Sequence, residues 1–65
     1  MKNKRGQTMC ERLTEEFDYL KTVNDYAHRK ALAYKALGAA DIAIEFGLIT
    51  YTEWGRFVET FFQLE

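Results

Sequence analysis

The sequence predicts an all-α protein, a small bundle of two or three helices in one domain. Three observations lead to this fold class. The 65 residues include no proline, the residue that most strongly interrupts helices. Hydrophobic residues make up 48% of the chain and recur at helical spacing. Two segments also carry complete signals for a helix start. Residues 8–65 are therefore the expected helical domain, and residues 1–7, with Lys2, Lys4 and Arg5, are expected to be a flexible basic tail.

The first helix is expected to begin after Thr8, because Thr8 and Glu11 have the spacing of a capping box. No glycine or proline then marks a break before Gly38, so one option is a single long helix over residues 9–46. Such a helix is about 57 Å long at about 1.5 Å per residue, which is far more than residues 51–64 could cover. This option therefore requires an oligomer.

The other option is a break at residues 22–25, where four poor helix formers lie together and Thr22 or Asn24 could act as an N-cap. The result is a three-helix bundle. Its second helix would begin with basic and end with acidic residues, the reverse of what the helix dipole favours, at a cost of roughly 0.3 kcal/mol per charge. That cost is too small to exclude the three-helix bundle, and the sequence leaves both options open. A chain of this length buries only about 60% of its unfolded surface, so a second copy or a partner is expected to complete the core.

Residues 47–54 predict a tight corner between two helices. Gly47 suits the left-handed position that closes a helix. Thr50 and Glu53 form a second capping box, and Ile49 and Trp54 have the spacing of a hydrophobic staple. The last helix is expected over residues 51–64.

The last helix predicts an aromatic interaction face. Six of the ten aromatic residues lie between Phe46 and Phe62. The candidate interaction residues on this face are Tyr51, Trp54, Phe57, Phe61 and Phe62. The preceding helix offers a complementary stripe of small residues, Ala33, Ala36, Ala40 and Ala43. One alanine stripe covers only one side of a helix, so part of the aromatic face is expected to remain at an interface.

A basic band forms the second candidate surface. Lys21, His28 and Lys35 recur every seven residues and would line one helix face, with Arg29 and Lys30 beside them. The band lies between an acidic segment, residues 8–20, and a mostly acidic segment, residues 36–65. This charge pattern favours head-to-tail or antiparallel association, and the band itself suits an acidic protein surface better than nucleic acid.

The residues that could carry catalysis do not form a recognisable set. The chain has no serine, and its only cysteine, Cys10, is 18 residues from its only histidine, His28. Asp25 and His28 are spaced to share a metal, but two ligands do not make a site. The acids Glu15, Glu16 and Asp18 are explained by their place in the first helix, and no metal, cofactor or catalytic residue is predicted.

The functional expectation is a small non-enzymatic protein-interaction module or regulator, self-associating or bound to a larger protein. One alternative is a nucleic-acid-associated regulator that uses the basic band over residues 21–35. Another is a phage or mobile-element inhibitor of a larger host protein, an expectation for bacterial and phage proteins of this size. The basic N-terminal residues precede no apolar segment of the kind signal peptides have, and charges interrupt residues 31–49, so a cytoplasmic protein with no membrane span is expected.

Overall fold

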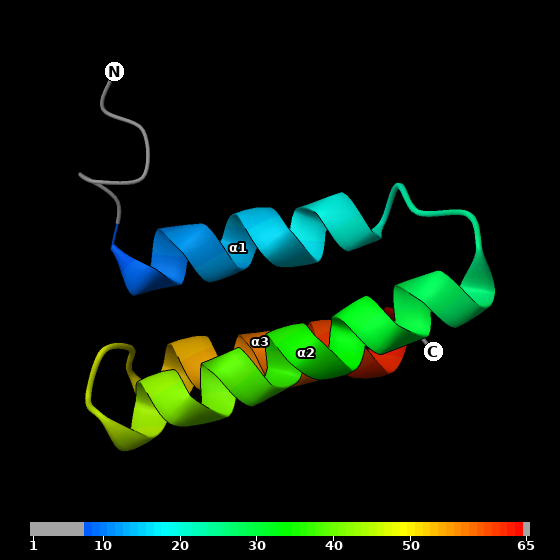
Figure 1. The fold of residues 1–65 in the computed structure, drawn as a ribbon. Helices are drawn as coiled ribbons and strands as arrows, with labels where there is room; N and C mark the ends of the chain where they lie inside the picture. The colour runs from blue at the N-terminus through cyan, green and yellow to red at the C-terminus, as the bar shows by residue number, and fades with distance from the viewer. Residues whose placement is uncertain (1–7, 65) are drawn as a thin grey trace.

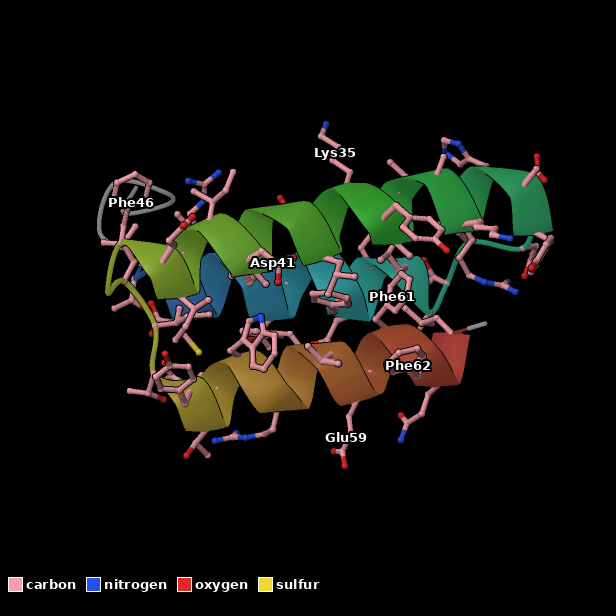
Figure 2. The ribbon with its side chains drawn as sticks, turned by 90° about the horizontal axis from the view of Figure 1, so that it is seen from below. Lys35, Asp41, Phe46, Glu59, Phe61 and Phe62 are labelled. Carbon is pink, nitrogen blue, oxygen red and sulfur yellow. The ribbon has the colours of Figure 1, made fainter. Side chains whose placement is uncertain are left out.

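The computed structural model describes residues 8–64, which form three α-helices and no strand: α1 (Met9–Leu20), α2 (Tyr26–Glu45) and α3 (Tyr51–Leu64). Figure 1 shows α2 returning antiparallel to α1, with α3 beside α2. Figure 2 looks at the α2–α3 pair from below and shows α1 behind it, so α1 packs on one side of a two-helix layer. The all-α bundle is confirmed. The predicted tail, residues 1–7, lies outside the described residues.

The long-helix option is wrong, because the chain turns at residues 21–25. The Thr22 hydroxyl donates a 2.7 Å hydrogen bond to the Tyr19 carbonyl and so closes the end of α1. The N-cap of α2 is Asp25, whose carboxylate accepts from the backbone N–H groups of Ala27 and His28. The expectation that Thr22 or Asn24 caps the second helix is therefore wrong. Asp25 supplies a stronger acceptor, and its charge at the helix start offsets the unfavourable order of charges along α2.

The corner between α2 and α3 has the predicted geometry. Gly47 takes a φ of +72°, and the Leu48 N–H donates a 2.8 Å hydrogen bond back to the Ala43 carbonyl. Thr50 and Glu53 then form a reciprocal capping box with distances of 2.9 and 3.1 Å. Thr8 and Glu11 form the same arrangement at the start of α1. Both predicted capping boxes are confirmed.

The core lies where the three helices meet. Its buried residues are Leu13, Phe17, Leu20, Ala33, Ala36, Ala40, Ala43, Ile49, Phe57 and Phe61. The alanine stripe of α2 is buried as predicted, and its small side chains let α1 and α3 approach α2 closely. The Phe17 ring fills the centre by stacking on Phe57, with ring centroids 5.3 Å apart.

Several large apolar side chains remain exposed on the three helices. Among the described residues, eight are more than half exposed: Tyr19, Tyr26, Tyr34, Ile42, Phe46, Leu48, Tyr51 and Phe62. Where such side chains gather into one patch, they mark an interaction site. In the described part of the chain no helix is both long and apolar enough to span a membrane.

Candidate interaction surfaces

The first candidate surface is the side of the α2–α3 layer that faces away from α1, here called the α2/α3 face (Figure 2). At one end Asp41 and Glu45 from α2 lie beside Tyr51 and Trp54 from α3, and at the other end Tyr34 from α2 and Phe62 from α3 both contact Phe61. Val58 is four residues from both Trp54 and Phe62, on the same side of α3. An open hollow on this face lies between Asp41, Ile44, Glu45, Tyr51 and Trp54. The face therefore combines aromatic side chains with two carboxylates.

A hydrogen bond between side chains organises the middle of the α2/α3 face. The Trp54 indole Nε1 donates to Asp41 Oδ1 at 2.8 Å, which joins α3 to α2. A half-buried indole needs a partner for its N–H, and the carboxylate provides it. This bond holds the Trp54 ring across the groove between the two helices.

At the other end of the face three rings contact one another in sequence. The Tyr34 ring meets Phe61 edge to face with centroids 5.0 Å apart, and Phe61 meets Phe62 in the same manner at 5.5 Å. Phe61 is buried, whereas Tyr34 and Phe62 are exposed. Phe61 thus connects the core to the surface rings and restricts where they can lie.

The predicted aromatic face of the last helix is divided by the fold. Phe57 and Phe61 belong to the core, and Trp54 is half-buried. Tyr51 and Phe62 are 79% and 65% exposed. Of the five residues singled out by the sequence, only these two are mostly exposed.

The predicted basic band does not form one helix face. Lys21 lies in the turn after α1, with its Nζ 3.4 Å from Asp18 Oδ1, because the chain breaks before His28. The expectation that Lys21, His28 and Lys35 share a helix face is therefore wrong. His28 and Lys35 remain exposed on α2.

Two further residues of the band are engaged locally. Arg29 Nη1 donates a 3.0 Å hydrogen bond to the Val23 carbonyl and so ties the turn to α2. The charged groups of Arg29 and Lys30 also lie 5.6 and 5.7 Å from the centroid of the Tyr26 ring. These contacts within the turn and the first turns of α2 account for the positions of Arg29 and Lys30.

A groove between α1 and α3 holds the single cysteine. The Cys10 thiol lies within hydrogen-bonding reach of the Glu53 carboxylate, and burial and this carboxylate raise the pKa of Cys10 above 9.0 against the opposing effects of Thr14 and Arg56. A thiol with a raised pKa is a weak nucleophile at neutral pH. His28 lies in the first turn of α2, at the opposite end of the bundle from Cys10 (Figure 1), so the two residues are not brought together.

The described residues also contain no group of three or more His, Cys, Asp or Glu side chains placed to hold a metal ion. Asp25, one of the two possible ligands in the sequence, uses its carboxylate to cap α2.

Comparison of the chain with protein-family models, curated proteins and solved structures finds no match.

Proposed function

We propose that this chain is a small non-enzymatic protein-interaction module whose α2/α3 face binds an apolar helix of a larger protein. The observation that carries the proposal is the exposure of Tyr51 and Phe62, at 79% and 65%, on one side of α3. Burial of an aromatic ring of this size contributes about 1.5–3 kcal/mol. Two such rings supply the central contacts of an interface.

The spacing of residues along α3 suits a helical partner. Tyr51, Gly55, Val58 and Phe62 follow one another at i, i+4, i+7 and i+11, so they form one strip roughly 16 Å long. Gly55 and Val58 are half-buried and lie low between the two rings. Apart from the chain neighbours of Gly55 and the backbone of its own helix, no atom lies within 4 Å of the place where a Gly55 side chain would begin. A partner helix could settle against this low middle section between the rings.

The charges beside the strip indicate the kind of partner. Asp41 and Glu45 lie along the α2 edge of the face. A partner with an apolar stripe and flanking Lys or Arg residues would complement them, whereas nucleic acid would be repelled. Acidic surroundings and exposed rings thus favour a protein partner over the nucleic-acid alternative.

The experiment is affinity capture from the cells that encode the chain, with three forms of the protein as bait. These are the wild type, the double variant Tyr51→Ser/Phe62→Ser, and the control Arg56→Ser. Arg56 is exposed and lies in the groove between α1 and α3, away from the strip. The expected result is one protein retained by the wild type and the control and lost with the double variant, with direct binding then measured on the purified pair. Equal retention by all three forms would contradict the proposal.

A further inference from the structure

The hollow at the corner end of the α2/α3 face combines two kinds of group that bind cations. Asp41 and Glu45 supply carboxylates from α2, and Tyr51 and Trp54 supply aromatic rings from α3, with Ile44 as the fifth lining residue. Figure 2 shows Asp41 on the side of α2 that faces α3. The hollow is open to solvent, so a group from another molecule can enter it.

We infer that this hollow binds the guanidinium group of an arginine side chain supplied by another protein. The inference rests on the proposed function for the source of the arginine, and it names the polar group that the partner inserts beside its apolar helix face. Three observations support it: the absence of a paired cation at the two carboxylates, the position of these carboxylates on α2, and the two aromatic rings.

The two carboxylates have no cation of their own in the described part of the chain. Within residues 8–64 neither Asp41 nor Glu45 forms an ion pair. Asp41 accepts the Trp54 N–H through Oδ1, and a carboxylate can accept further donors through its second oxygen. Glu45 is exposed and lies about one helical turn beyond Asp41. A cation in the hollow would therefore meet two carboxylates without breaking the hydrogen bond between Trp54 and Asp41.

The position of the carboxylates on α2 makes a bound cation favourable. Asp41 and Glu45 are four residues apart, the spacing at which like charges on a helix repel each other. Glu45 is also the last residue of α2, where the helix dipole is negative, and the last turn of α2 carries no basic residue. Both effects disfavour negative charge at this end of the helix. A cation bound between the two carboxylates would offset both.

The two rings favour a guanidinium over an ammonium group. A guanidinium is planar, so it can stack on an aromatic face while its edge donates hydrogen bonds to a carboxylate. The hydrogen bond to Asp41 fixes the Trp54 ring before a ligand arrives, so binding costs little freedom there. The Tyr51 side chain is 79% exposed, which leaves ring surface for stacking. An ammonium group is compact and strongly hydrated, and it gains less from the rings.

The first test uses Trp54, the only tryptophan of the chain, because its single indole N–H signal in a proton–nitrogen NMR spectrum reports on the hollow directly. The probe is Nα-acetyl-arginine amide, titrated at constant ionic strength. The signal is expected to shift to saturation with a Kd on the order of 10–100 mM, because exposed ion pairs and cation–π contacts are individually weak. The lysine derivative should bind more weakly. The citrulline derivative, which has the shape of arginine without its charge, should give no saturable shift. No binding of the arginine derivative, or equal binding of either comparison compound, would overturn the inference.

The second test uses variants to locate the site. Glu45→Gln keeps the side-chain length and the bond between Trp54 and Asp41 but removes one charge, so the Kd of the arginine derivative should rise about fivefold. Tyr51→Leu should also weaken binding, and Tyr51→Phe should restore it, because the ring is what stacks. The control Glu16→Gln removes a carboxylate from the groove between α1 and α2 and should leave the Kd unchanged. Equal losses in Glu45→Gln and Glu16→Gln would show that the probe follows net charge alone and would overturn the inference.

The NMR titration and the affinity capture fail separately. A capture that depends on Tyr51 and Phe62, together with a wild type that does not bind the arginine derivative, would overturn the guanidinium site and leave the proposed function standing. Saturable binding of the arginine derivative, together with a capture that does not depend on Tyr51 and Phe62, would support the guanidinium site and contradict the proposed function.

Discussion

The Trp54 indole and the Asp41 carboxylate form a 2.8 Å hydrogen bond that joins α3 to α2 at the centre of the α2/α3 face. The two residues are 13 positions apart and come from different helices. The packing of α3 on α2 therefore gives Trp54 a polar partner that cannot be inferred from its position in the corner. The strength of this hydrogen bond reports how firmly α3 is held against α2.

Asp41→Ala should lower the free energy of unfolding by about 1 kcal/mol, because it removes the acceptor of the Trp54 N–H. Asp41→Asn keeps an acceptor oxygen and should lose much less. Thermal unfolding followed by circular dichroism compares the two, and each kcal/mol corresponds to a shift of about 4–8 °C in a domain of this size. Equal losses for both variants would show that the hydrogen bond contributes nothing.

The same substitution at two glycines should have opposite effects. Gly47→Ala forces alanine into a φ of +72° and should destabilise the fold by about 1 kcal/mol. Gly38→Ala lies in regular helix with open space around it and should stabilise the fold by about 0.8 kcal/mol. Urea unfolding at low micromolar concentration measures both. A loss of stability at Gly38 would mean that its small size is needed inside the fold.

The capping carboxylate of Glu53 should make stability depend on pH. The hydrogen bond from the Thr50 backbone N–H is the main cause that lowers the pKa of Glu53 below its ordinary 4.5. Burial is the next largest effect and opposes it, and Cys10, the Thr50 side chain and Arg56 lower the pKa further. Since the folded-state pKa is the lower one, the contribution is present above pH 4.5 and is lost as the pH falls through the folded-state pKa.

Glu53→Gln separates the cap from its charge, because an amide oxygen still accepts from Thr50 but does not titrate. The wild type should be more stable than Glu53→Gln at neutral pH, and the difference should shrink as the pH falls below about 4.5. Unfolding measured from pH 7 to pH 2 gives this difference directly. A difference that is constant over the range would contradict the assignment.

Cys10 should react slowly with iodoacetamide near neutral pH, because burial and the Glu53 carboxylate both raise the pKa of its thiol above 9.0. Glu53→Gln removes the negative charge beside the thiol, so the pH at which the reaction rate is half-maximal should be lower in this variant. An unchanged midpoint in this variant would mean that burial alone sets the pKa of Cys10.

The sequence predicts the features that depend on neighbouring residues. Both capping boxes, the Gly47 turn and the buried alanine stripe have the expected form because each is decided within a few positions along the chain. The sequence allows a break at residues 21–25 but does not decide between this break and a single long helix. It depends on how far Leu20 can be buried by α2, which is a property of the packed bundle.

The candidate interaction surface is harder to predict from the sequence, because it also depends on how the helices pack. Periodicity places Trp54, Phe57 and Phe62 on one apolar face, but only packing determines that Phe57 enters the core while Phe62 stays exposed. The Trp54–Asp41 and Cys10–Glu53 contacts join different helices, so no local spacing indicates them.

The most direct test of the proposed interaction face is site-specific photocrosslinking from α3 in the cells that encode the chain. A benzophenone side chain replaces Phe62 in one variant and Arg56, an exposed residue of the groove between α1 and α3, in the control. If the α2/α3 face binds a larger protein, the probe at position 62 should give one crosslinked product of higher mass, and the probe at position 56, about 120° away around α3, should give little or none. No product from position 62, or the same products from both positions, would contradict the account.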